Sequence, residues 1–219
     1  LRQGQSPVDL VVHRRYNEEI NTQLNIVPGL MGVILTITMV FITTLAVTRE
    51  TERGTMENLL ATTVSPLEVI AGKITPYMLV GYVQIGVILL GAKFLFEVPM
   101  EGSLWLLLGL SFFFIAANLC VGITFSTLAK NQLQAVQGAI FFFLPSLLLS
   151  GFMFPFKGMP DWAQFVGNIL PLTHYLVIVR GIMLKGCVYS DIAPHFHALL
   201  AFLLGALLLS VLRYRQRLD

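Results

Sequence analysis

Apolar residues gather along this chain into five uninterrupted runs, each about as long as a membrane-crossing helix. Stretches of roughly 20 apolar residues without a turn signal are typical of transmembrane helices. The predicted spans are Ile26–Thr48, Ile74–Phe96, Ser103–Leu128, Leu133–Phe154 and Phe196–Leu212. The pattern therefore predicts an all-α, polytopic membrane protein. Residues 1–25 are polar, and we interpret them as the end of an outer, periplasmic segment.

The longest strongly charged interval between two runs reads RETERGTMENLLATTVSPLEVIAGK and extends from Arg49 to Lys73. We expect the helix of the first span to continue to about Arg53, since Gly54 has the residue type that commonly follows a helix end. Thr55 can cap a new short helix, Met56–Thr62, with Glu57 in its first turn.

A second helix start follows within the same interval. Ser65 and Glu68 form a capping box, and Pro66 occupies the first helical position of a helix that continues into the second span. The short helix before it carries an apolar strip of Met56, Leu59 and Leu60. An apolar strip at the membrane surface indicates a partner protein. The alternative interpretation is a solvated connector with balanced charges.

A second unusual interval lies between Pro155 and Pro194, where prolines interrupt the apolar stretches. Neither apolar piece reaches about 20 residues, so neither is expected to span the membrane. We expect two short amphipathic or re-entrant helices at the outer surface, with Trp162 and Tyr175 at the interface. Any irregular backbone in lipid must be covered by protein or line a cavity. The alternative is an ordinary outer loop.

Within this outer interval, Asp161 and Arg180 are the charges that we expect partner groups to hold. The orientation follows from the basic residues, because cytosolic loops carry an excess of Lys and Arg. With the charged interval in the cytosol, the cytosolic basic residues are Arg49, Arg53, Lys73, Lys130, Arg213, Arg215 and Arg217. The C-terminus is then cytoplasmic. With no signal peptide visible, we expect an earlier span and an outer domain to precede Leu1.

The composition excludes several classes of function. The chain is 56% hydrophobic and 12% charged, with a mean hydropathy of +0.78, whereas a soluble domain has about 25% charged residues. The net charge of +2 argues against nucleic-acid binding. Gly72-Lys73 lacks the other residues of a phosphate-binding loop.

No candidate catalytic set emerges from the sequence. The acidic residues all lie outside the five spans, which argues against an ion-coupled carrier. His174, His195 and His197 have no Cys or acidic cluster beside them, so the metal interpretation is disfavoured. We expect mid-span Gln84 and Asn118 to form hydrogen bonds between helices. A secondary transporter or channel remains the alternative function, with an intramembrane enzyme as a third.

Over about residues 26–213, the chain resembles the permease subunits of ABC-2 type ABC exporters, similar to bacterial multidrug-exporter-like inner membrane permeases. The first motif comprises Glu50, Glu52, Arg53, Gly54, Thr55, Glu57, Leu59, Ser65, Pro66, Glu68, Gly72 and Lys73. The second comprises Gly151, Pro155, Pro160, Trp162, Pro171, Leu172, Thr173, His174, Tyr175, Arg180, Gly181, Lys185 and Gly186. Such permeases have six spans per subunit, and we expect five of these six in this chain.

The resemblance implies a non-enzymatic subunit that works with a second permease subunit, as a homodimer or heterodimer, and with ATP-binding subunits that hold ATP and Mg. No cofactor is expected on this chain. The residues implied to contact the ATPase are Glu50, Glu52, Arg53, Gly54, Thr55, Met56, Glu57, Leu59, Leu60, Ser65 and Pro66. Those of the outer re-entrant segment are Pro160, Asp161, Trp162, Pro171, His174 and Arg180.

Under this interpretation, residues 26–219 form an ABC-2 type transmembrane domain in a bacterial inner membrane. The scarcity of fixed charges in the spans favours an amphipathic or hydrophobic substrate, drug-like or lipid-like. Membrane lipid and a periplasmic adaptor are further candidate partners.

Overall fold

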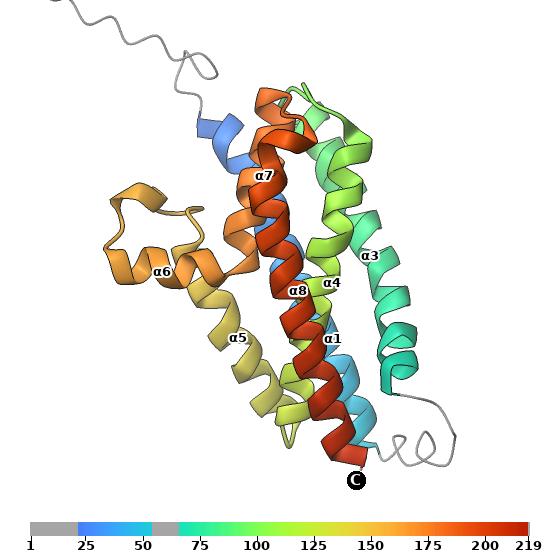
Figure 1. The fold of residues 1–219 in the computed structure, drawn as a ribbon. Coiled ribbons are helices and arrows are strands. Elements are labelled where there is room, and N and C mark those ends of the chain that lie inside the picture. The colour runs from blue at the N-terminus through green and yellow to red at the C-terminus, as the bar shows by residue number, and fades with distance from the viewer. Residues whose placement is uncertain (1–21, 54–65, 219) are drawn as a thin grey trace, which may run out of the picture.

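The protein is an assembly of helices, seen in a computed structural model that describes residues 22–53 and 66–218 (Figure 1). No strand occurs in these residues. The helices are α1 (Thr22–Glu52), α3 (Pro66–Phe94), α4 (Leu104–Leu128), α5 (Gln132–Leu149), the 3-10 helix η1 (Phe156–Gly158), α6 (Asp161–Ile169), α7 (Pro171–Lys185) and α8 (Tyr189–Leu218).

Five of the described helices are long and apolar enough to cross a membrane, which confirms the predicted all-α, polytopic fold. They are α1, α3, α4, α5 and α8. Helices α6 and α7 meet at an angle of 80°. If this bent pair is counted as one broken span, the described helices make six crossings. The sequence pattern therefore predicts the number of long helices correctly.

Several helix boundaries agree with local signals, and others do not. α1 ends at Glu52, close to the predicted end, and α3 begins at Pro66 as the capping signal predicts. α5 ends at Leu149, earlier than the predicted Phe154. α8 begins at Tyr189, so Pro194 lies inside the last span and does not precede it. Pro194 has no N–H to donate to the carbonyl oxygen of Ser190 one turn earlier, so α8 lacks one helical hydrogen bond there.

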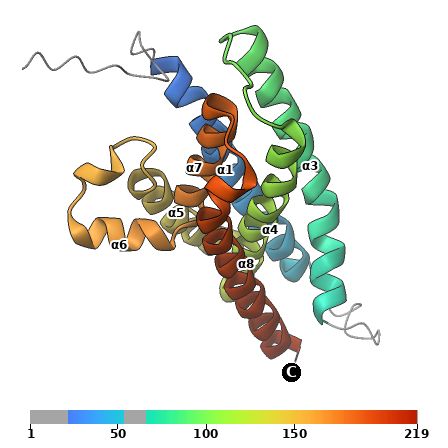
Figure 2. The same ribbon diagram turned by 45° about the horizontal axis from the view of Figure 1, so that its top comes forward.

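The centre of the bundle is α4, which packs most extensively against α8 and α1. In its most apolar stretch 72% of the residues are buried, compared with 17% for α3 and 17% for α5. Figures 1 and 2 show α3 along one flank of the bundle, with α5 on another and α6 projecting sideways. The core is therefore built from helices that are far apart in sequence.

Tyr175 of α7 occupies the middle of this core. Its ring stacks on Phe114 of α4 with centroids 3.8 Å apart, and its hydroxyl is 2.7 Å from Ser111 Oγ. The expectation that Tyr175 lies at a membrane interface is wrong, because its side chain is fully buried. Gly32 of α1 makes room for it, since a Cβ at that position would lie 3.0 Å from the ring.

Candidate functional site

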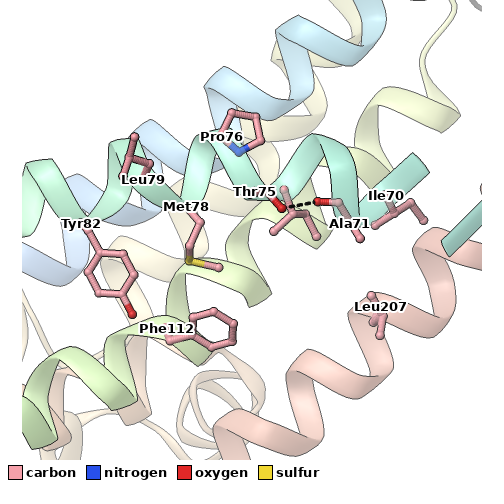
Figure 3. Close-up of a pocket in the computed structure, with 10 residues that line it drawn as sticks. Ile70, Ala71, Thr75, Pro76, Met78, Leu79, Tyr82, Phe112 and Leu207 are labelled. Carbon is pink, nitrogen blue, oxygen red and sulfur yellow. Dashed lines mark hydrogen bonds between the residues drawn. The ribbon is translucent and has the colours of Figure 1, made fainter. Parts of the chain in front are cut away.

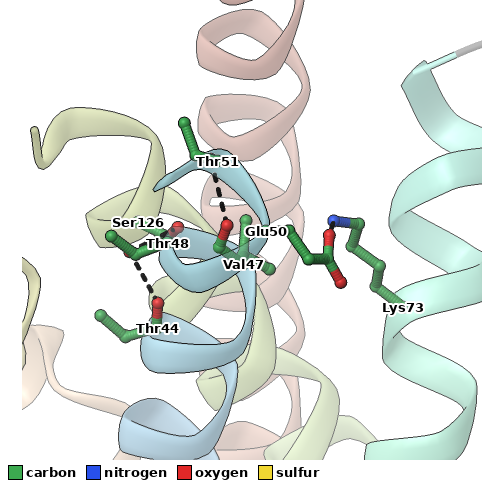
Figure 4. Close-up of polar contacts among 7 residues, drawn as sticks. All are labelled: Thr44, Val47, Thr48, Glu50, Thr51, Lys73 and Ser126. Carbon is green, nitrogen blue, oxygen red and sulfur yellow. Dashed lines mark hydrogen bonds and ion pairs between the residues drawn. The ribbon is translucent and has the colours of Figure 1, made fainter. Parts of the chain in front are cut away.

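The last turns of α1 bind α4 through hydroxyl groups. Thr48 Oγ1 lies 2.9 Å from Ser126 Oγ (Figure 4). Thr44 Oγ1 donates to the carbonyl oxygen of Gly122 at 3.2 Å. The helices approach closely here, since a Cβ on Gly122 would lie 2.8 Å from the Val40 carbonyl oxygen. Small residues and hydroxyl groups are the usual means by which helices associate in membranes.

Glu50 in the last turn of α1 forms an ion pair with Lys73 of α3 (Figure 4). The Lys73 side chain is 12% exposed and that of Glu50 is 42% exposed, so water reaches one side of the pair. The two residues bracket the predicted coupling interval in sequence. The ion pair therefore joins the last turn of α1 to α3 at a position about two turns after Pro66.

Glu52 binds a different helix. Its Oε1 accepts a hydrogen bond from the backbone N–H of Gln132 at 2.8 Å, and its Oε2 accepts one from the Gln132 side-chain amide. Gln132 is the first residue of α5. Asn131 caps the same helix, because its Oδ1 accepts from the Gln134 N–H at 2.9 Å. A carboxylate at a helix N-terminus also stabilises the helix dipole.

We call Thr48, Glu50 and Glu52, with their partners Ser126, Lys73 and Gln132, the α1 junction. It joins the end of α1 to α4, α3 and α5.

The α1 junction contains only part of the predicted coupling set. Arg53, also in that set, is exposed just beyond α1, and Pro66 opens α3. The predicted helix Met56–Thr62 lies outside the described residues. So do the remaining predicted contacts, Gly54, Thr55, Met56, Glu57, Leu59, Leu60 and Ser65.

The interval after α5 contains two short helices, as the sequence predicts. Leu170 is extended, with φ −75° and ψ 133°, because it precedes Pro171 and separates α6 from α7. α6 projects from the bundle (Figures 1 and 2). It exposes Trp162 and Phe165 and buries Ala163 and Gly167, so it is amphipathic.

Of the two predicted kinds of helix, amphipathic or re-entrant, α7 agrees with the re-entrant kind, because most of its residues are buried. It packs against α8, α1 and α4. Its burial, and the 80° bend between α6 and α7, fit the re-entrant alternative, in which protein covers the segment. Burial arises from side chains of three other helices, which a local pattern does not show.

Side chains of α7 bind the backbone that the break at Leu170 interrupts. Thr173 Oγ1 donates to the Gly167 carbonyl oxygen at 2.6 Å. His174 Nε2 donates to the Asn168 carbonyl oxygen at 2.8 Å, and its Nδ1 lies 3.1 Å from Nδ1 of His195 in α8. A carbonyl oxygen only accepts hydrogen bonds, so the proton of neutral His174 is on Nε2 and His195 donates to its Nδ1. We call residues 149–174 the α6 corner.

Arg180 is held, as predicted, but by backbone groups. Its Nε donates to the Asn25 carbonyl oxygen at 3.2 Å, and one terminal nitrogen donates to the Gly151 carbonyl oxygen at 3.4 Å. The guanidinium thus links α7, α1 and the turn after α5. Asp161 is exposed in the first turn of α6, where its charge is favourable to the helix dipole.

The mid-span amides differ from one another. Gln84 Nε2 donates to Thr38 Oγ1 of α1 at 3.0 Å, which confirms a bond between helices. Asn118 Nδ2 instead donates to Phe114 O in its own helix at 2.9 Å, so that prediction is wrong. Gln84 Oε1 and Asn118 Oδ1 are buried without a hydrogen-bond partner among the described residues.

No group of three or more His, Cys, Asp or Glu residues in the described ranges is arranged to hold a metal.

An apolar pocket of about 760 Å³ lies between α3, α4 and α8 (Figure 3). Its lining includes Ile70, Met78 and Leu79 of α3, Phe112 of α4 and Leu207 of α8. The hydroxyl groups along it bind backbone, Tyr82 to Leu108 O at 3.2 Å and Thr75 to Ala71 O at 2.8 Å. The pocket therefore suits apolar groups and offers few free polar contacts.

The chain belongs to the ABC-2 family of transporter proteins. Residues 3–212 match the sequence profile of the family described as "ABC-2 family transporter protein". The chain is therefore a polytopic membrane protein of this family.

Among relatives, the "Probable multidrug ABC transporter permease YbhS" of Escherichia coli (strain K12) is 32% identical over 213 residues, covering 97% of this chain and 56% of that protein. "Inner membrane transport permease YhhJ" of the same organism is 32% identical over 195 residues, covering 87% of this chain and 52% of that protein. "ABC transporter G family member 20" of Dictyostelium discoideum is 28% identical over 192 residues, covering 87% and 26%. The chain spans about half the length of the bacterial relatives. No solved structure matches it.

Proposed function

We propose that this chain is the membrane-spanning part of an ABC exporter permease, driven by ATP hydrolysis on a separate ATP-binding subunit. It moves an amphipathic or hydrophobic molecule, drug-like or lipid-like, out of the cytoplasm across a bacterial inner membrane. Two permease subunits form the path, and the C-terminus is cytoplasmic. The proposal is supported by family membership and by the multidrug permease name of the bacterial relative.

The single observation that carries the proposal is the α1 junction. A partner protein that drives transport from outside the membrane must bind a part of the permease that is connected to the permease's transmembrane helices. Residues 54–65 connect α1 to α3 in the sequence. The Glu50–Lys73 ion pair joins these two helices to each other. The same end of α1 binds α4 and α5. A force applied to this interval therefore acts on four spans.

The apolar pocket supports the substrate class. It is large enough for part of a drug-sized or lipid-like molecule, since ligand pockets commonly measure about 300–1,000 Å³. The side chains that line it in Figure 3 are mostly apolar, without a charge. An apolar lining without fixed charge favours substrates that themselves partition into lipid.

Substitution of the predicted apolar strip tests the proposal. Leu59→Asp together with Leu60→Asp, in the full-length permease, is expected to abolish co-purification of the ATP-binding subunit and leave membrane insertion intact. Val188→Asp is the control, because Val188 is 59% exposed between α7 and α8, outside the candidate spans, and the change is expected to have no effect on co-purification. Normal co-purification of the double variant would contradict the proposal.

A further inference from the structure

The end of α1 carries two carboxylates that bind different helices. Glu50 and Glu52 are two residues apart, and positions with that spacing point about 200° away from each other on an α-helix. Glu50 reaches Lys73 on α3, and Glu52 reaches Gln132 on α5. The two flanking helices are therefore attached to opposite sides of the same turn.

The attachment to α5 fixes the direction of that helix at its first residue. Glu52 accepts from both the backbone N–H and the side chain of Gln132, so it constrains position and orientation together. The first N–H groups of a helix have no partner within it, and a charged acceptor there forms a stronger bond than a neutral one. Asn131 satisfies the N–H of Gln134.

The body of α5 is much less buried than that of α4, with 17% of its most apolar stretch buried compared with 72%. Its buried residues are Ala135, Ala139 and Ser146. The first two have small side chains, so little apolar area fixes the helix against its neighbours. Polar contacts at its two ends therefore contribute more to its position than they do for α4, which is largely buried.

The other end of α5 is in close contact with α6. A Cβ at Gly167 would lie 2.5 Å from the Leu149 carbonyl oxygen and 2.7 Å from the Phe156 ring, so α6 rests directly on the last residue of α5. Thr173 and His174 of α7 then bind the carbonyl oxygens of Gly167 and Asn168 at 2.6 and 2.8 Å. Displacement of α5 along its axis therefore displaces α6 and the start of α7.

We propose that Glu52 is a positioning residue that transmits movement of the α1 end through α5 to the α6 corner. The Glu50–Lys73 pair is the parallel link to α3. This inference rests on the proposed function, in which the ATP-binding subunit supplies the movement. It adds a route by which that movement reaches the far end of the permease.

Exchange of the two groups that form the bond tests the link. Gln132→Glu places two carboxylates together and breaks it. The double variant Glu52→Gln/Gln132→Glu restores it, because the introduced amide donates to the introduced carboxylate and its oxygen still accepts from the backbone N–H of position 132. Lys130→Gln is the matched control, since it changes a charge in the same turn on an exposed side chain.

Movement is measured in the full-length permease purified with its ATP-binding subunit. Spin labels are placed at Lys157→Cys in η1 and Leu212→Cys in α8, both exposed, after Cys120→Ala and Cys187→Ser. The unaltered pair is expected to show a shift in label distance between the nucleotide-free state and the state trapped with ATP and vanadate. Gln132→Glu is expected to lose that shift, and the double variant and Lys130→Gln to keep it.

Co-purification of the ATP-binding subunit is expected to be equal in all variants. A shift that survives Gln132→Glu, a double variant that does not recover it, or no shift in the unaltered protein would each overturn the link. Absence of any co-purifying ATP-binding subunit would instead overturn the proposed function. The link can also be tested without the ATP-binding subunit. A double-mutant cycle of thermal stability in detergent should show coupling between Glu52 and Gln132. Absence of this coupling would also reject the link.

Discussion

The α1 junction and the α6 corner use polar groups in different ways. At the junction, side chains of regular helices bind one another or a helix N-terminus, and water reaches several of them. At the corner, the helix is broken at Leu170, and buried side chains of α7 bind carbonyl oxygens near the C-terminal end of α6. Substitutions at the junction should therefore alter mechanism more than folding, whereas substitutions at the corner should alter stability first.

The largest effect concerns the side of the membrane on which each region lies. Single cysteines at Lys130→Cys near the junction and Gly158→Cys within the corner, in a Cys120→Ala/Cys187→Ser background, should react with a membrane-impermeant maleimide from opposite sides. The reason is the bias of basic residues toward the junction end. Intact cells should label only position 158, and inverted vesicles only position 130. Labelling of both positions from one side would show that the α1 junction and the α6 corner do not face opposite sides of the membrane.

Gly167→Ala should destabilise the protein by about 1–3 kcal/mol, because the new methyl group meets the Leu149 carbonyl oxygen and the Phe156 ring. Thermal unfolding in detergent measures the loss. Gly158→Ala is the control in the same segment, since a Cβ there meets no atom within 4 Å. Equal stability of the two variants would show that α6 does not rest on α5.

Arg180→Ala should cost about 1 kcal/mol of stability, because the carbonyl oxygens of Asn25 and Gly151 lose a donor. We expect it to impair export more than association with the ATP-binding subunit, because the contact joins α1 and α7 far from the junction. The measurement compares efflux with co-purification for the same preparation. A parallel fall in both would count against this separation of the two regions.

The smallest effect is expected within the junction. Thr48→Val and Ser126→Ala, combined in a double-mutant cycle, should give a coupling energy of about 0.6 kcal/mol, as is usual for hydroxyl pairs between membrane helices. Thr75→Val is the control, because Thr75 bonds only to a carbonyl of its own helix, so it should show no coupling to Ser126. A coupling above about 2 kcal/mol would exceed the range for such pairs and place the junction among the folding determinants.

Much of the fold could be predicted from local signals. Span length and composition predict the five long helices, and the proline at position 66 predicts the start of α3. The prolines between α5 and α8 predict the broken segment, although α8 begins before Pro194. These features depend on backbone geometry and hydrophobicity, which act within a few residues.

The contacts between helices could not be predicted in the same way. Glu52 and Gln132 are 80 positions apart, and Tyr175 and Ser111 are 64 apart, so their pairing depends on how the helices pack. The apolar stretch of α7 is too short to span, which predicts an amphipathic or re-entrant helix, but its burial against α8, α1 and α4 depends on packing. One local signal was present, since Asn131 has a residue type that caps helices and does cap α5.

The central position of α4 has a consequence for biosynthesis. Its principal neighbours are α1, which is made before it, and α8, which is made last among the described helices. During synthesis α4 can pair with α1 at once, but the face that later contacts α8 must remain against lipid or insertion machinery. That face includes Thr124, whose hydroxyl lies 2.8 Å from Ser210 of α8 in the finished protein. We therefore expect the nascent chain to pass through a stage in which α1 and α4 are already paired and the bundle is completed only by the last helix.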